Sequence, residues 1–355
     1  MSVPGPVLVV GAGLLGTSIG MALSHAGVAV LLEDARPENV RTATALGAGT
    51  PAPPDASPGL VVVAVPPDHL ARCIADALRG TGAVVTDVGS VKSAPLAAVG
   101  ELVDEAALTR YVGSHPMAGS ERSGPLAASA ALFDGRPWAV TPHETSAVEA
   151  VRAVGELVVA CGATPLRFTP AEHDRAVART SHLPHLLAAL VAGRLGDAPR
   201  THLALSGQGV RDVTRIAAGD PGLWQQIIAA NTTALSDLLR DVRADVDTLL
   251  EALSSGDRTA LAGVLGRGVA GTAVIPAKHG GPPRAETTVY VAVPDTPGEL
   301  ARLLSHTGEI GVNIEDLRID HDPARQYGLV ELSVATESVE HLLSSLAERG
   351  WTAHR

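Results

Sequence analysis

The chain has 355 residues, a length that predicts two or three domains rather than a single core. Hydrophobic residues make up 46% of the sequence but aromatic residues only 2%, so we expect a core of Ala, Val and Leu. The formal net charge of −11 argues against nucleic acid or an anionic membrane as a partner, and an anionic substrate would need a local cationic pocket.

Nothing at the N-terminus indicates export, because residues 1–6 carry no basic segment and Glu33 and Asp34 follow soon. No uninterrupted apolar run is long enough to span a bilayer. The two cysteines, Cys73 and Cys161, lie in apolar stretches and are expected to be buried thiols outside any disulfide framework. We therefore expect a cytoplasmic protein.

The chain begins with the pattern of a dinucleotide-binding unit. Residues 7–10 predict a buried strand, residues 14–25 a helix and residues 28–32 a second strand. The sequence G-x-G-x-x-G joins the first strand to the helix, and Asp34 follows about 20 residues later. This full context makes the glycine motif specific. The residues expected to contact a cofactor here are Gly11, Gly13, Leu14, Leu15 and Gly16.

Asp34 lies at the end of the second predicted strand, where a carboxylate can accept hydrogen bonds from ribose hydroxyls. It would repel the 2′-phosphate of NADP, so we expect NAD as the cofactor. Arg36 is the opposing feature, because a nearby arginine can hold that phosphate.

Two further buried strands are predicted at residues 60–65 and 83–86, with a helix over about 68–78 between them. At the end of the first, Val65 and Pro66 are expected to contact the cofactor. The second leads into D-V-G-S-V-K, which places Ser90 on the ligand side of a parallel sheet. A helix cap is the alternative role for Ser90.

Residues 113–124 concentrate reactive side chains between glycines and a proline. The segment contains His115, Ser120, Glu121 and an arginine. So polar and broken a run predicts a ligand-facing loop rather than a core strand or a long helix. An ordinary surface loop would explain the glycines but not the histidine and the carboxylate.

The rest of the chain is predicted to be mostly helical up to about residue 271, after a helix at 144–160 and a strand at 163–168. A threonine followed by proline at 169–170 predicts a capped helix start, and further helices are expected at 224–239 and 242–253. Their excess of apolar surface favours packing against a second copy of the chain.

Four separated motifs resemble the prephenate/arogenate dehydrogenase family. They are D-V-G-S-V-K at 87–92, H-P-M-A-G-S-E-R-S-G at 115–124, S-H-L-P-H at 181–185, and R-D-V-T-R-I-A at 211–217 followed by Asp220, Pro221 and Trp224. The resemblance implies NAD-dependent oxidative decarboxylation of prephenate to 4-hydroxyphenylpyruvate, or of arogenate to tyrosine, in tyrosine biosynthesis. It also implies a homodimer.

In this reaction a hydroxyl group loses its proton while the carbon that bears it loses a hydride. A neutral base is therefore needed, and His115 has the right chemistry. Loss of CO2 makes the ring aromatic, so no metal is expected, and the sequence offers no zinc motif. The family pattern suggests that Ser90 hydrogen-bonds the hydroxyl or His115, and that Arg215 pairs with the ring carboxylate. Further residues assigned to substrate binding are Ser120, Glu121 (as a gate or positioning residue), His182, His185, Asp212 and Trp224.

Structural roles are the alternatives for these residues. His115 could be a structural histidine, and Arg215 could form a surface pair with Asp212 three residues earlier. His182 and His185 could line one helix face, and Trp224 could belong to the core.

The last 70 or so residues, after a linker at 275–284, have the pattern strand, helix, strand, strand, helix. D-T-P-G-E-L at 295–300 and G-V-N-I-E-D-L at 311–317 resemble the ACT regulatory domain. The resemblance implies an amino-acid site near Asp295, Gly298 and Asn313, with tyrosine as the effector. The alternative is a domain that only adds an oligomer contact.

The expected fold class is α/β: a Rossmann doubly wound parallel sheet at 1–168, an all-α substrate and dimerisation domain at 169–276, a linker at 277–286 and an α+β ACT-like (ferredoxin-like) domain at 287–355. Two other functions stay open. One is a dehydrogenase of an amino-substituted prephenate, and the other is a non-catalytic sensor of NAD and an amino acid. The sequence does not separate prephenate from arogenate.

Overall fold

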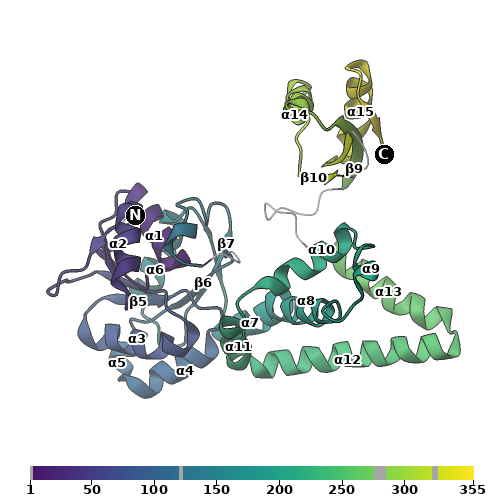
Figure 1. Cartoon of the computed structure of the whole chain (residues 1–355). Coiled ribbons are helices and arrows are strands. Elements are labelled where there is room, and N and C mark those ends of the chain that lie inside the picture. The colour runs from purple at the N-terminus through teal and green to yellow at the C-terminus, as the bar shows by residue number, and fades with distance from the viewer. Residues whose placement is uncertain (1–2, 120–122, 276–284, 322–326) are drawn as a thin grey trace. The chain divides into compact units, whose positions relative to one another are not determined.

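The computed structural model describes residues 3–119, 123–275, 285–321 and 327–355 (Figure 1). The chain forms two compact units, Met1–Asp247 and Thr248–Arg355. The change from one unit to the next falls within a long helix, α12 (Thr232–Ser255).

The N-terminal unit is built on a five-stranded sheet whose paired strands are all parallel. The strands are β1 (Val7–Val10), β2 (Val30–Glu33), β3 (Thr50–Pro51), β4 (Leu60–Val63) and β5 (Val84–Asp87), in the order β3-β2-β1-β4-β5. The chain reverses its direction of travel across the sheet between β1 and β4, which is where such sheets bind ligands. The predicted doubly wound sheet is confirmed.

Helices cover both faces of this sheet (Figure 1). One face packs against α1 (Leu14–His25), α2 (Pro37–Ala45) and α6 (Val148–Ala160), and the other against α3 (Pro67–Gly80), α4 (Ser93–Leu102) and α5 (Glu105–Leu108). Neighbouring strand residues divide between the two layers: Val7 and Val9 belong to the first core, and Leu8 to the second. This alternation explains why the strands are apolar on both sides.

A second sheet of three strands follows, made of β6 (Gly113–Pro116), β7 (Pro137–Thr141) and β8 (Thr164–Arg167), with the short helix η1 (Pro125–Ala127) between the first two. The expectation that residues 113–124 avoid a strand is therefore wrong for the first four. Ser114 is buried in β6, but its hydroxyl donates to Asp87 O at 2.8 Å and accepts from Thr86 at 3.1 Å. A satisfied polar group can be buried, which the polarity of the sequence alone did not reveal.

The helical part of this unit begins at the predicted cap, where Thr169 Oγ1 accepts from the backbone N–H of Glu172 and Glu172 reaches back to Thr169. Its elements are α7 (Pro170–Val177), the π-helix η2 (Ala178–His182), α8 (Leu183–Gly193), α9 (Arg200–Leu203), α10 (Gln208–Arg215), η3 (Ile216–Ala218), α11 (Pro221–Ala230) and the start of α12. π-Helical turns are frequent at functional sites.

The predicted break between helices near residues 239–242 is wrong. The helix is interrupted at Asn231, whose φ of −121° and ψ of 33° are not helical, and residues 232–255 form one helix. Asn231 is buried, and its amide donates to the carbonyl of Asp174 at 2.9 Å. A contact with another helix, absent from the local sequence pattern, thus sets the break.

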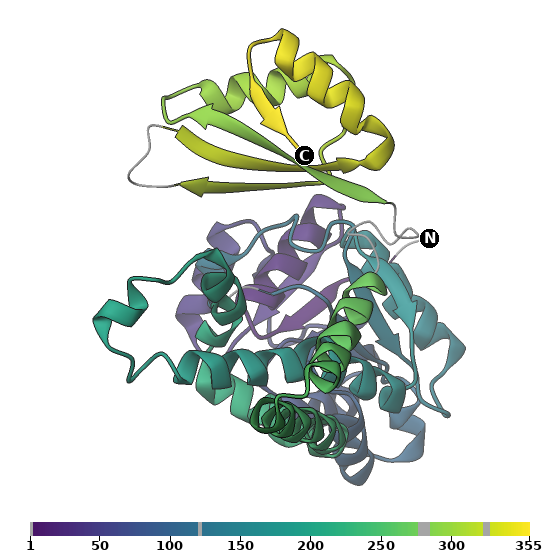
Figure 2. The same ribbon diagram turned by 90° about the vertical axis from the view of Figure 1, so that its right-hand side faces the viewer.

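The C-terminal unit contains α13 (Arg258–Ala273), followed by a four-stranded antiparallel sheet with two helices on one face (Figure 2). In chain order, the strands and helices of this part are β9 (Glu286–Pro294), α14 (Glu299–Glu309), β10 (Asp316–His321), β11 (Tyr327–Ala335), η4 (Thr336–Ser338), α15 (Val339–Glu348) and β12 (Thr352–His354). The strand order β10-β11-β9-β12 is that of a ferredoxin-like fold, as expected. The short strand β12 was not predicted.

The cysteines are both free thiols. Cys161 is buried, and burial raises its pKa to about 12. Cys73, on α3, is only half-buried, so the expectation of a buried thiol is wrong there. Among the described residues, no helix combines the length and the apolar character needed to cross a membrane.

Candidate active site

The loop between β1 and α1 has the shape that a dinucleotide pyrophosphate requires. Gly11 has a φ of +101°, and a Cβ there would lie 2.4 Å from Ala64 O. A Cβ on Gly16 would lie 1.8 Å from Gly11 O, so the helix packs directly on the loop. At Gly13 nothing lies within 4 Å of the Cβ position, which leaves open space at the N-terminus of α1. The loop therefore fits the cofactor.

The neighbouring residues expected to contact the cofactor lie around the same loop. Asp34 Oδ2 accepts a hydrogen bond from Ala12 N at 2.7 Å, and its Oδ1 accepts one from Arg36 N at 2.8 Å. Val65 Cγ1 lies 3.2 Å from the Cβ position of Gly11, and Pro66 precedes α3 as its N-cap. Leu14 and Leu15 form the first turn of α1.

Alanine is expected to affect stability at one glycine of the loop and NAD binding at another. Gly16→Ala should lower the free energy of unfolding by about 2 kcal/mol, because its methyl group would overlap the Gly11 carbonyl. Gly13→Ala should leave the melting temperature close to that of the wild type but weaken NAD binding about tenfold or more. Thermal melts and NAD titrations of both variants check this, and similar NAD affinity for Gly13→Ala and wild type would contradict the loop assignment.

A buried ion pair anchors the strand that carries His115. Lys92 Nζ donates to Asp87 and to the carbonyl of Ser114, the second contact at 2.7 Å. The other oxygen of Asp87 accepts from the Tyr111 hydroxyl at 2.8 Å. Burial lowers the pKa of Lys92, and Asp87 only partly offsets that effect. This cluster fixes β6 against the end of β5.

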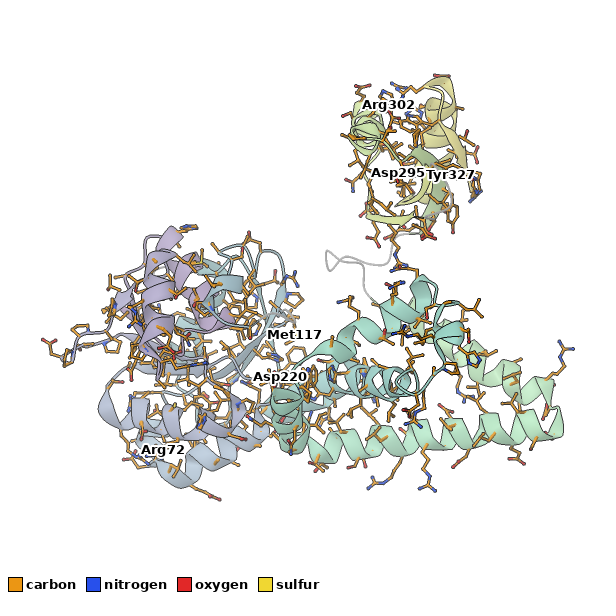
Figure 3. The ribbon with its side chains drawn as sticks, viewed as in Figure 1. Arg72, Met117, Asp220, Asp295, Arg302 and Tyr327 are labelled. Atoms are coloured by element: carbon orange, nitrogen blue, oxygen red, sulfur yellow. The ribbon has the colours of Figure 1, made fainter. Side chains whose placement is uncertain are left out.

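His115 is the first member of a hydrogen-bonded group with two residues of α7. Its Nδ1 lies 3.0 Å from His173 Nε2, and His173 Nδ1 lies 2.9 Å from Asp174 Oδ1. Burial lowers the pKa of His115 well below its ordinary value, and His173, Lys92 and His182 lower it further. His115 is therefore a neutral imidazole near pH 7, as a general base must be. Met117, labelled in Figure 3, is the residue directly after β6, the strand that carries His115.

His182 and His185 lie beside this group, next to Trp224. The His185 ring stacks on Trp224, with centroids 3.6 Å apart, and the His182 ring meets the same indole edge-on. Asn231 Nδ2 lies 3.2 Å from His182 Nδ1 and also donates to the carbonyl of Asp174. Burial lowers the pKa of His182 to about 4. Asn231 and Trp224 thus link His182 and His185 to the group formed by His115, His173 and Asp174.

His182 Nε2 is buried and has no hydrogen-bond partner among the described residues. Since the amide of Asn231 is a donor, Nδ1 of His182 accepts and Nε2 carries the hydrogen. A buried N–H without an acceptor is rare in a folded protein and suits an oxygen atom of a ligand.

Arg215 is exposed at the end of α10, which packs with η3 against α8. In the part of the chain that the structure describes, no ion pair joins it to Asp212, whose carboxylate accepts from Gln208 at 2.9 Å. Ile216, the next residue, is hydrogen-bonded through its backbone to His185. Arg215 thus directly precedes a residue that contacts His185, and among the described residues no hydrogen bond or ion pair joins Arg215 to His115.

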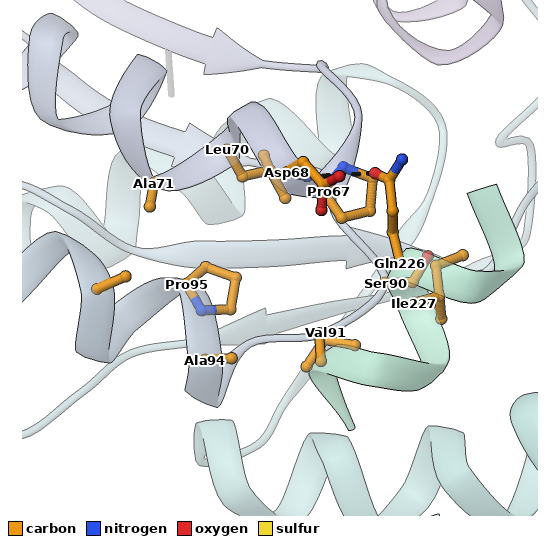
Figure 4. Close-up of a pocket in the computed structure, with 12 residues that line it drawn as sticks. Pro67, Asp68, Leu70, Ala71, Ser90, Val91, Ala94, Pro95, Gln226 and Ile227 are labelled. Atoms are coloured by element: carbon orange, nitrogen blue, oxygen red, sulfur yellow. Dashed lines mark hydrogen bonds between the residues drawn. The ribbon is translucent and has the colours of Figure 1, made fainter. Parts of the chain in front are cut away.

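Ser90 lines a cavity of about 180 Å³ between α3, α4 and α11 (Figure 4). The other lining residues are mainly apolar, and Gln226 of α11 accepts from the backbone N–H of Asp68 at 3.3 Å across its mouth. No hydrogen bond joins Ser90 to His115 within the described ranges, so that expected contact is absent from this structure. Ser120 and Glu121 lie outside the described residues.

Three residues of the site escaped the sequence analysis: His173, Asp174 and Asn231. His173 and Asp174 lie four and five residues after the helix cap at Thr169, so their inward direction follows from that helix start.

Within the described residues, no group of His, Cys, Asp and Glu side chains is arranged to bind a metal ion.

The unit contains a glycine loop that fits a dinucleotide and the neutral imidazole of His115 on β6. These two features, with the helical part that follows, are those of a dinucleotide-dependent dehydrogenase with a helical second domain. Comparison with known proteins makes the class specific. The sequence profile for the prephenate dehydrogenase nucleotide-binding domain matches residues 19–166, and that for the prephenate dehydrogenase dimerization domain matches residues 169–267. The first match begins within α1, so the glycine loop is assigned from the structure.

Individual proteins similar to this chain carry names from the same family. The chain is 37% identical to a probable prephenate dehydrogenase, NovF, of Streptomyces niveus, over 98% of this chain and 99% of that protein. It resembles the structure of Aquifex aeolicus prephenate dehydrogenase in complex with hydroxyphenyl propionate and NAD+ (TM-score 0.68, 25% identity, 76% of this chain and 98% of that one). It also resembles Synechocystis arogenate dehydrogenase (TM-score 0.64, 26% identity, 75% and 98%). The chain belongs to the prephenate dehydrogenase family.

Proposed function

We propose that the chain catalyses the NAD-dependent oxidative decarboxylation of prephenate or arogenate, giving 4-hydroxyphenylpyruvate or tyrosine. The observation that carries the proposal is the neutral His115, hydrogen-bonded at 3.0 Å to a buried histidine in a unit that also holds a dinucleotide loop. A sensor of NAD would not need such a base. The solved relatives carry NAD+ with a hydroxyphenyl acid in one case and the name arogenate dehydrogenase in the other, which supports this substrate class.

The reaction needs one proton acceptor and one carboxylate partner. The acceptor for the hydride of the hydroxyl-bearing carbon would be supplied by bound NAD. His115 accepts the hydroxyl proton as that carbon becomes a carbonyl. When the ring carboxylate leaves as CO2, its bonding electrons aromatise the ring and the carbonyl oxygen becomes a phenolate. His115 returns the proton to this oxygen, so no net proton is released.

The side chains proposed to bind the oxygen atoms of the substrate, its ring carboxylate included, lie in the helical part of the unit. The buried N–H of His182 suits a substrate oxygen, and the guanidinium of Arg215 suits the ring carboxylate. The roles of Ser90, Ser120, Glu121, His185, Asp212 and Trp224 remain as proposed from the sequence: hydrogen bonding to the hydroxyl for Ser90, and substrate contact for the others.

Steady-state kinetics with prephenate and arogenate, each with NAD and NADP, test the function. We expect NADH and CO2 to form in equal amounts from at least one of the two substrates. Absence of turnover with both, by a folded protein that binds NAD, would overturn the assignment.

Cofactor choice should favour NAD, because Asp34 lies beside the loop and Arg36 is exposed. We expect the ratio of kcat/KM for NAD to that for NADP to fall about tenfold or more in Asp34→Asn, since the repulsion of a 2′-phosphate is lost. Equal or better turnover of NADP by the wild type would show that Arg36 decides instead.

Tyrosine is proposed as an effector of the C-terminal unit. Gly298 has a φ of +95° at the start of α14, and the Asn313 amide donates to Glu315 at 2.8 Å in the loop before β10. With Asp295, these residues mark the proposed amino-acid site. We expect tyrosine to inhibit the enzyme and raise its melting temperature, and Asn313→Ala to weaken both effects. If tyrosine does neither in the full chain, the regulatory role fails.

A homodimer and a cytoplasmic location complete the proposal. The matched dimerization domain supports a second copy, as do exposed apolar side chains of α8 and α10 and the loop between α9 and α10: Leu190, Val191, Leu205 and Val213. Two free thiols and a nicotinamide cofactor suit the cytoplasm. Light scattering of the purified protein tests the dimer.

A further inference from the structure

His115, His173 and Asp174 form a continuous chain of hydrogen bonds that leads away from the reacting hydroxyl into the protein. The two links measure 3.0 and 2.9 Å. The side chains of His173 and Asp174 are 2% and 9% exposed, so water has little access to that end of the chain. The positions of the hydrogens can therefore be assigned from the buried end outward.

Asp174 is an acceptor only. Its Oδ1 and Oδ2 accept from the backbone N–H groups of Lys92 and Ser93, both at 2.8 Å, where the positive end of the α4 dipole favours a carboxylate. Burial alone would raise the pKa of Asp174, but hydrogen bonds from His173, Ser93 and Lys92 outweigh burial and hold it below its ordinary value. His173 Nδ1 must then carry the hydrogen that Asp174 accepts.

The tautomer of His115 follows from that of its neighbour. A His173 ring that donates from Nδ1 to Asp174 can accept a hydrogen bond at the lone pair of Nε2. The 3.0 Å contact then requires the hydrogen on His115 Nδ1, which leaves His115 Nε2 bare. Nε2 has no hydrogen-bond partner among the described residues and is the nitrogen available to take a proton from a substrate.

We propose that His173 and Asp174 are positioning residues that hold His115 in the tautomer with a bare Nε2. The inference rests on the proposed function, in which the proton lent to His115 must return to the phenolate oxygen.

The pH dependence of the reaction gives a readout that simple packing would not move. The charged or titratable groups facing His115 are His173 from α7, His182 from η2 and Lys92 from the segment after β5, and each lowers its pKa. Removing His173 takes away one of these effects, so the pKa of His115 should rise. Because the base works when neutral, the acid limb of kcat/KM should move to higher pH.

Two substitutions separate hydrogen bonding from volume. His173→Gln can still donate to Asp174 and accept from His115, so we expect kcat to fall no more than about tenfold. His173→Leu can do neither, and kcat should fall about 10²- to 10³-fold with the KM for NAD unchanged. The matched controls are His143→Gln and His143→Leu, at a half-buried histidine hydrogen-bonded to the Tyr111 carbonyl outside this group. Equal losses in both His173 variants, with an unmoved acid limb, would overturn the proposal.

Nitrogen NMR of the histidine rings tests the tautomer without any substrate. In the wild-type protein at pH 7 we expect His115 with hydrogen on Nδ1 and a bare Nε2, and His173 in the same form. His173→Gln should retain the His115 tautomer. A His115 ring with hydrogen on Nε2 in the wild type would overturn the inference even if the enzyme is active, whereas the expected spectrum with no dehydrogenase activity would refute only the proposed function.

Discussion

Replacing His115 with asparagine is expected to lower kcat about 10³-fold while leaving NAD affinity unchanged. Asparagine can still donate to His173 through its amide, but it cannot accept the hydroxyl proton. The glycine loop, which lies on another element, keeps its geometry. Stopped-flow or steady-state formation of NADH, alongside a fluorescence titration with NAD, measures both quantities. Turnover within tenfold of the wild type would remove His115 as the base.

The pH profile of the wild type follows from the same residue. The folded pKa of His115 lies well below the ordinary value of 6.5, because burial and the neighbouring His173, Lys92 and His182 all disfavour its charged form. The base is thus fully available above pH 6.5, and kcat/KM should begin to fall only at lower pH. A decline centred at or above pH 6.5 would indicate that His115 is more solvated than the structure shows.

Replacing Lys92 with methionine is expected to lower the free energy of unfolding by about 3 kcal/mol. The Asp87 carboxylate, fully buried, would keep hydrogen bonds from Tyr111 and Gly89 but lose its counter-charge. The Ser114 carbonyl would also lose its donor. Urea unfolding followed by circular dichroism gives the difference.

Two controls make this test specific. The double variant Asp87→Asn, Lys92→Met removes both charges and should recover part of the loss. Arg72→Met breaks an exposed pair with Asp76, at 3.9 Å, and should change stability by less than about 1 kcal/mol (Figure 3). If Lys92→Met is no less stable than Arg72→Met, the buried pair does not anchor β6.

Much of the fold could be predicted because local patterns agree with it. The strand, glycine loop and helix at the N-terminus, the cap at Thr169 and the order of elements in the last unit all have short-range signals. The errors came where distant contacts decide the structure. Ser114 is in a buried strand because Asp87 and Thr86 satisfy its hydroxyl, and Asn231 ends a helix because Asp174 binds its amide.

The site was predictable in part for the same reason. His115, His182, His185 and Trp224 stand in motifs that resemble a known family, and the structure connects them through contacts with one another or with shared neighbours. His173 belongs to no such motif, and its role depends on α7 approaching β6 in space. Neither spacing nor composition reports such an approach between elements.

The most direct test is a crystal structure of the protein with prephenate and NADH, a pair that cannot react. We expect His115 Nε2 about 3 Å from the ring hydroxyl oxygen, with the guanidinium of Arg215, from the same or the second copy, on the ring carboxylate. A complex in which that hydroxyl meets a different base, with His115 turned away from the ring, would rule out His115 as the base.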